Sequence, residues 1–161
     1  MKRQIRWNVF ESNSSSMHSL TINSLGAEYS SLSVDQDTNK VFTKFGEFGW
    51  GYDVYRNAKM KLSYLVTMLI ETHRDCMSLD ELCETEDFKK INDAVAEYMN
   101  CDGIIIDEEI GKSTWNENCN THSGYIDHQS ICNIDELLEE CTIKDFIFDT
   151  GIELIIDNDN Y

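Results

Sequence analysis

The chain has 161 residues, the usual size of one domain, and 41% of them are hydrophobic, which is enough for one compact core. Its 30 Asp and Glu against 13 Lys and Arg give a formal net charge of −17, which argues against direct binding to nucleic-acid phosphates. The sequence contains no apolar run of about 18 residues and no signal-peptide segment, so we expect a soluble protein of the cytoplasm without membrane association.

The first half of the chain predicts strands. In residues 3–10, Ile5, Trp7 and Val9 alternate with polar residues, as in a half-buried strand. Residues 19–25 predict a second strand and residues 41–45 a third. Glycines alternate with aromatic residues in the following segment, "GEFGWGYD", which predicts a loop or strand end with room around the backbone.

Two helices are expected next. Residues 53–72 have an apolar stripe at helical spacing, with Asp53 as a possible N-cap; the stripe is formed by Ala58, Leu62, Leu65 and Leu69. Residues 85–100 predict a second helix, with Thr85 as its N-cap and a stripe formed by Phe88, Ile91, Val95 and Tyr98.

The remaining elements complete an α+β pattern. Residues 103–107 predict a central strand, residues 108–123 are polar and irregular, and residues 123–130 predict a strand or strand edge. A short helix over 133–142 with Asn133 as cap and two strands over 145–149 and 152–157 follow. Strands before and after the helices predict a single α+β domain over 1–161, with a mixed or largely antiparallel sheet packed against two main helices.

The negative charge is concentrated in the second half of the chain. Residues 1–70 contain eight Lys or Arg and six Asp or Glu, a net charge of +2, whereas residues 71–161 contain five and 24, a net of −19. A dense negative surface attracts basic proteins, including the grooves in which other proteins hold DNA or RNA. The alternative is that the charge only favours solubility. The predicted partner surface consists of Asp80, Glu81, Glu84, Glu86, Asp87, Asp135, Glu136, Glu139 and Glu140.

A polar cluster follows the first predicted strand, in "NVFESNSSSMHSL". Its side chains could bind an anion or polarise a substrate, but Ser and Asn also bond readily to the nearby backbone, so a structural loop is the alternative. His18 favours function because an imidazole exchanges a proton near neutral pH. The residues of this cluster that we single out are Asn13, Ser14, Ser15, Ser16 and His18.

A second polar cluster lies in "HSGYIDHQS". Along a strand, Asp127 and Gln129 share one face, and His128 and Ser130 share the other. The alternative is a strand edge whose polar side faces water. If the two clusters meet, the predicted catalytic residues are His18, His128, Asp127 and Ser16. The residues predicted to bind a ligand are Asn13, Ser14, Ser15, Trp50, Tyr125, Gln129 and Ser130.

A zinc site is a weaker hypothesis. The spacing C-x2-H-x5-H-x3-C supplies ligands that suit zinc, but its central loop is very short for a zinc finger. Its candidate ligands are Cys119, His122, His128 and Cys132. In a cytosolic chain, six scattered cysteines are expected to be reduced thiols, and we expect no metal and no cofactor.

Four stretches of the sequence resemble a known family: "VFESNSSSMHSL", "GEFGWGY", "GYIDHQS" and "FIFDTGIELIIDNDN". Together they are similar to small proteins of phages and low-GC bacteria that open with a VFETNSSSxHS-like stretch. This chain has Ser12 where Thr is usual, a change that keeps the hydroxyl. The resemblance implies an origin in a phage or mobile element, and it implies no mechanism.

Two functions remain open from the sequence. The first is an acidic phage-type accessory protein that binds and inhibits a basic, nucleic-acid-handling host protein, as anti-CRISPR proteins and DNA mimics do. The second is a small enzyme acting on a nucleotide or phosphoester with the two polar clusters. We favour the first, because the charge asymmetry is a property of the sequence whereas the pocket is inferred. The sequence does not indicate an oligomeric state.

Overall fold

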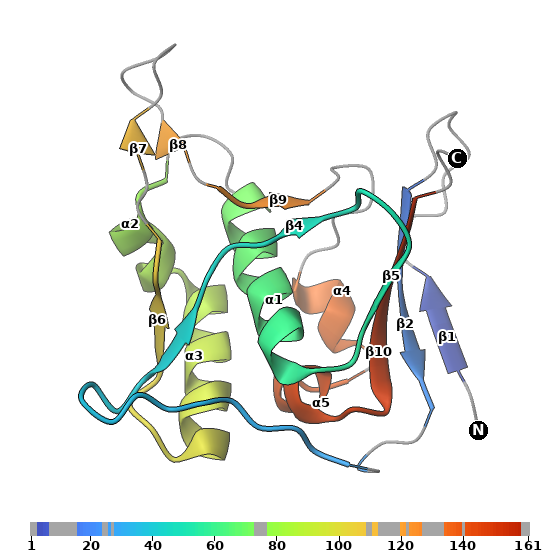
Figure 1. Cartoon of the computed structure of the whole chain (residues 1–161), viewed down its shortest axis with the longest axis horizontal. Helices are drawn as coiled ribbons and strands as arrows, with labels where there is room; N and C mark the ends of the chain where they lie inside the picture. Colours follow the sequence, from blue (N-terminus) through green and yellow to red (C-terminus); the bar gives the residue numbers. More distant parts are fainter. Residues whose placement is uncertain are drawn as a thin grey trace.

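The fold is α+β, as predicted, and is seen in a computed structural model (Figure 1). The structure describes residues 3–6, 16–23, 26, 28–72, 77–108, 111–112, 120–121, 123–126, 134–139 and 141–158. In this part of the chain no helix is long and apolar enough to cross a membrane.

Within the described residues, the main sheet has four antiparallel strands in the order β1-β2-β10-β5. The strands of this sheet are β1 (Arg3–Arg6), β2 (Ser16–Ile22), β10 (Ile152–Asn158) and β5 (Asp53–Tyr55). The two long central strands pair over their whole length, and Leu20 lies opposite Leu154 with both side chains fully buried. The beginning and the end of the described chain are therefore held together by the same sheet.

The other strands are short and paired two by two. β3 (Val41–Thr43) lies parallel to β6 (Ile104–Ile106), and β4 (Glu47–Phe48) lies parallel to β9 (Tyr125–Ile126). β7 (Gly111–Lys112) and β8 (Asn120–Thr121) form a small antiparallel pair. The strand predicted over 103–107 is confirmed, but its central position is wrong, because β6 belongs to a two-stranded sheet in the described part of the chain.

The helix α1 (Ala58–Thr72) is the centre of the molecule. Figure 1 shows it between the main sheet and α3 (Glu86–Met99). The predicted stripe is buried, and so are residues on the other sides of the helix, as expected for a helix enclosed by neighbours. The predicted start at Asp53 is wrong, because Asp53 lies in β5, and Asn57 instead accepts a hydrogen bond from the Met60 amide.

The second predicted helix is confirmed as α3, and a shorter helix, α2 (Leu79–Glu84), precedes it without having been predicted. Thr85 ends α2 and caps α3, where its hydroxyl accepts from the Phe88 amide at 3.2 Å. The single residue between the two helices makes them a continuous, bent segment. The sequence pattern missed α2 because a six-residue helix shows little periodicity.

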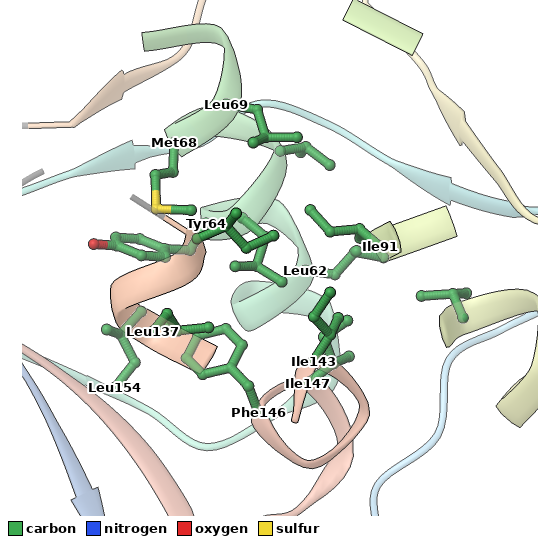
Figure 2. Close-up of a cluster of buried hydrophobic side chains, with 14 of the residues drawn as sticks. Leu62, Tyr64, Met68, Leu69, Ile91, Leu137, Ile143, Phe146, Ile147 and Leu154 are labelled. Carbon is green, nitrogen blue, oxygen red and sulfur yellow. The ribbon is translucent and has the colours of Figure 1, made fainter. Parts of the chain in front are cut away.

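The chain ends with α4 (Ile134–Leu138), α5 (Ile143–Phe148) and β10. The strand predicted over 145–149 is wrong, since most of this segment lies in α5, for which Thr142 is the N-cap. A short apolar run suits a buried strand and a buried helix turn equally well. Figure 2 shows the core in which side chains of α1, α3, α4, α5 and β10 converge, including Leu62, Ile91, Leu137, Phe146 and Leu154.

Candidate functional site

An acidic surface begins on α2 and α3, whose first turns carry the pairs Asp80–Glu81 and Glu86–Asp87. Carboxylates in these positions favour helix formation because they face the positive end of the helix dipole. Ser78 and Glu81 form a capping box, and the hydrogen bond from the Ser78 amide lowers the pKa of the Glu81 carboxyl. The same residues that start the helices therefore supply the charge.

The acids of α4 adjoin those of α3. Lys90 Nζ lies 3.0 Å from Asp87 Oδ1 on its own helix and 3.7 Å from Asp135 Oδ1 on α4. On the other side, Lys89 Nζ lies 3.1 Å from Glu84 Oε2 at the end of α2. The contacts of these two lysines connect all three helices. The acidic surface, as we use the term below, consists of Asp80, Glu81, Glu84, Glu86, Asp87, Asp135, Glu136 and Glu139.

This surface keeps an excess of negative charge that water can reach. Its eight carboxylates face two lysines, and the side chains of Glu84 and Asp135 are each 81% exposed. Ion pairs at such exposure contribute little to stability, about 0–1 kcal/mol, so the lysines are weakly held. The field also acts on Cys83, whose thiol pKa is raised by burial and by the neighbouring carboxylates Asp80 and Glu84.

Two of the predicted ligand-binding residues meet at another place. Trp50, in the loop after β4, stacks on Tyr125 of β9 with ring centroids 5.2 Å apart and an interplanar angle of 29°. Trp50 is 66% exposed and Tyr52 is 64% exposed. The parallel pairing of β4 with β9 brings these two rings together at the molecular surface, and their role in ligand binding stays a prediction.

The predicted proton carrier His18 lies in the interior. It sits on β2 with 0% exposure, and its Nδ1 shares a hydrogen bond of 2.9 Å with the Tyr64 hydroxyl of α1. The two rings are also in contact, with centroids 5.8 Å apart. A substrate would have to enter the core to reach this imidazole, so its position favours a structural tie between the sheet and α1.

Several predicted site residues lie outside the described residues: Asn13, Ser14, Ser15, Cys119, His122, Asp127, His128, Gln129, Ser130, Cys132 and Glu140. Ser16 begins β2, opposite Asn158 of β10. The predicted zinc ligands and the proposed meeting of His18 with His128 therefore stay predictions. Among the described residues, no group of His, Cys, Asp and Glu side chains could hold a metal ion.

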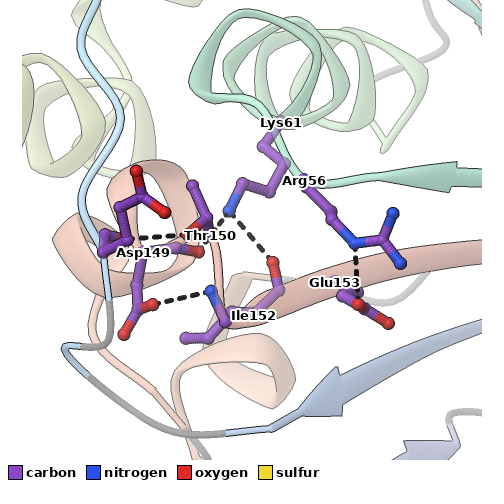
Figure 3. Close-up of polar contacts among 8 residues, drawn as sticks. Arg56, Lys61, Asp149, Thr150, Ile152 and Glu153 are labelled. Carbon is purple, nitrogen blue, oxygen red and sulfur yellow. Dashed lines mark hydrogen bonds and ion pairs between the residues drawn. The ribbon is translucent and has the colours of Figure 1, made fainter.

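Lys61 is a buried charge that the sequence analysis did not single out. Its ammonium donates to the main-chain oxygens of Asp149 at 2.8 Å and Ile152 at 3.0 Å, which ties α1 to the turn between α5 and β10 (Figure 3). Burial lowers the pKa of Lys61 to about 8, although the Asp149 carboxylate opposes this shift. The sequence does contain a sign that Lys61 is buried. Residues 62–70, which follow it, contain no charged residue, and such a run indicates a helix enclosed on all sides.

The surroundings of Lys61 indicate a structural role. The Asp149 carboxylate accepts hydrogen bonds from the amides of Gly151, at 2.8 Å, and Gly26. Nearby, Arg56 Nε donates to Glu153 Oε1 at 2.7 Å, which fixes the chain just before α1 to β10. A lowered lysine pKa is also typical of catalytic lysines, but Lys61 has 0% exposure. We therefore assign it to the framework.

Comparison with known proteins gives no match: no family model, no curated protein and no solved structure is significantly similar to the chain. The resemblance to phage and low-GC bacterial proteins stays a prediction. Function must therefore be argued from the acidic surface, the aromatic pair and the buried groups.

Proposed function

We propose that the protein binds a basic, nucleic-acid-handling host protein through its acidic surface and thereby inhibits it. The observation that carries this proposal is the continuity of the carboxylates from α2 through α3 to α4, which Lys89 and Lys90 bridge. A partner surface that extends across the three helices would meet these charges together. Attraction of this kind accelerates encounter and selects partners of opposite charge.

Inhibition is expected because the positive charge of such a partner lies in its nucleic-acid-binding groove. A protein that holds DNA or RNA concentrates Lys and Arg in the groove that contacts phosphates. The acidic surface is complementary to that groove and repels nucleic acid itself, so the partner would exchange one anionic ligand for another. In the proposed setting, a phage or mobile element, the inhibited protein would belong to a host defence system, as with anti-CRISPR proteins.

The described structure gives the enzymatic alternative less support. That alternative requires His18 to exchange a proton with a substrate, and His18 is enclosed by β2, β10 and α1. In contrast, six of the eight residues of the acidic surface are exposed without any rearrangement, and the other two, Asp87 and Glu136, are half-buried. No described feature favours nucleotide chemistry over binding, and the interaction function is therefore the one that we propose.

A pull-down from host lysate with two matched variants tests the proposal. One variant reverses three exposed acids of the acidic surface, Asp80→Lys, Glu86→Lys and Glu139→Lys. The control variant makes the same charge change on exposed acids elsewhere, Glu28→Lys, Glu47→Lys and Asp53→Lys. The wild type and the control variant should capture the same basic nucleic-acid-binding protein and release it at high salt. The variant with the reversed acidic surface should not capture this protein.

Equal capture by both variants would contradict the proposal, because binding would then depend on net charge or on another surface. Circular dichroism of the two variants shows whether each has kept its helices. Neither set of substitutions alters a buried residue, but Asp80→Lys and Glu86→Lys place a positive charge in the first turns of α2 and α3, so capture is compared only between variants whose spectra match the wild type.

A further inference from the structure

A groove of about 660 Å³ lies between α3 and the segment that joins α4 to α5. Its apolar lining comes from Ala94 and Tyr98 on α3 and from Leu138 and Ile143 on the facing segment. Its size falls within the usual range of ligand pockets, about 300–1,000 Å³. Tyr98 is the only exposed residue of the predicted α3 stripe, at 37%. Its ring packs against Phe148 and Tyr29, with centroids 4.1 and 5.8 Å away, and Tyr98 also lines this groove.

The groove shares an edge with the acidic surface. Lys90 lines the groove and also forms an ion pair with Asp87 on its own helix and one with Asp135 that joins α3 to α4. Any partner that covers the acidic surface therefore meets an apolar depression directly beside the carboxylates. Bulky side chains that fill such a depression dominate the binding energy of many interfaces, while the surrounding charges set orientation and encounter rate.

The charges around the groove favour a cationic occupant. Of its two lysines, Lys90 is paired with Asp87 and Asp135, whereas Lys144, whose Nζ lies 5.6 Å from the centroid of the Tyr29 ring, keeps its positive charge. Glu97 adds an exposed carboxylate to the lining. With a net charge of −17 on the chain, an organic anion would be repelled on approach.

We propose that the groove receives one bulky apolar side chain from a basic segment of the partner protein. Arg or Lys residues on either side of that side chain would bind the carboxylates of the acidic surface. In this arrangement an incoming cation takes the place of Lys90 at Asp87 and Asp135. This inference rests on the proposed function, and it adds to it the kind of segment that the partner must present.

Fluorescence polarisation with two labelled peptides tests the inference. One is a short peptide of alternating Arg and Ser with a Trp at its centre, and the other has Ala in place of the Trp. The Trp peptide should bind about tenfold more tightly or better, as expected for an anchoring aromatic residue. Ala94→Trp, which fills the groove, should remove this preference and leave binding of the Ala peptide unchanged.

A matched control fills a different hollow of the protein. Ser33 lines a second pocket of about 400 Å³ beside β3, so Ser33→Trp should keep the preference for the Trp peptide. Lys90→Met should tighten both peptides, because it removes the competing cation from Asp87 and Asp135.

A second measurement uses the unmodified protein. Cys141 lines the groove and is only 9% exposed, with its thiol donating to the Leu137 main-chain oxygen, so its slow alkylation reports access through the groove. Cys101 follows α3, is half-buried and does not line the groove. The bound Trp peptide should slow alkylation of Cys141 by iodoacetamide and leave that of Cys101 unchanged, as peptide mapping by mass spectrometry can show.

The outcomes separate the two proposals. Salt-sensitive binding of both peptides with equal affinity, without protection of Cys141, would overturn the groove inference and leave the acidic surface as the binding site. If neither peptide bound, both the groove inference and the proposed function would be overturned. A preference for Trp that survives in Ala94→Trp, with Cys141 still unprotected, would place the anchor elsewhere and also overturn the inference.

Discussion

The buried amine of Lys61 should make stability depend on pH in a defined direction. Its pKa is about 8 in the folded protein against 10.5 for an ordinary lysine. Between these two values the unfolded chain binds more protons than the folded one, so the free energy of unfolding must rise with pH. Each pKa unit corresponds to about 1.4 kcal/mol, and the full window therefore amounts to about 3 kcal/mol.

Lys61→Met isolates this effect, because methionine keeps an unbranched apolar side chain and removes the titrating group. Urea denaturation at intervals between pH 7 and 10 gives the free energy of unfolding of both proteins. The wild type should gain about 2–3 kcal/mol relative to Lys61→Met over this range. Tyr29 and Tyr55, whose pKa values are raised from 10.0 to about 12, begin to oppose this trend as the pH approaches 10, but they are present in both proteins and cancel in the comparison.

The result that would refute this reasoning is a constant difference between the two proteins from pH 7 to 10. Such a result would mean that the Lys61 ammonium keeps its ordinary pKa and is reached by water, in conflict with its 0% exposure and its two main-chain acceptors.

Three further predictions concern the framework that carries the acidic surface. His18→Ala should lower the free energy of unfolding by about 2 kcal/mol or more in urea denaturation, whereas a purely catalytic residue would leave it unchanged. Thr85→Ala should cost about 1–2 kcal/mol and reduce helical circular dichroism, and unchanged stability would mean that the cap is not used. Gly103→Ala should be far more destabilising than Gly26→Ala in thermal melts, because only at Gly103 would the new methyl collide with Asn92; equal losses would contradict this.

The parts of the fold that the sequence predicted are those in which local pattern and burial agree. The apolar stripe from Ala58 to Leu69 and the Thr85 cap each depend on residues within one or two helical turns. The errors occurred where tertiary packing decides. Asp53 of β5 pairs with Ile156 of β10, a contact between residues far apart in the sequence. Residues 145–149 are mostly helical, because the surrounding core encloses them.

The candidate site was predictable in composition but not in shape. Counting carboxylates shows that the second half of the chain is acidic, yet only the approach of α4 to α3, seen in the Lys90–Asp135 contact, shows that the two acidic segments adjoin. The groove beside them could not be inferred, because its walls come from helices that the sequence does not orient. For His18 the composition was misleading. Its neighbours in the sequence are polar, which suggested an accessible side chain, but the residue is fully buried.

Competition for the partner's nucleic acid tests the central claim most directly. The captured host protein is loaded with fluorescent DNA or RNA and titrated with the wild type, with the variant carrying Asp80→Lys, Glu86→Lys and Glu139→Lys, and with the control variant. We predict that the wild type and the control displace the nucleic acid and that the acidic-surface variant does not. A partner that binds this protein and retains its nucleic acid would contradict the account, because the acidic surface would then not occupy the groove.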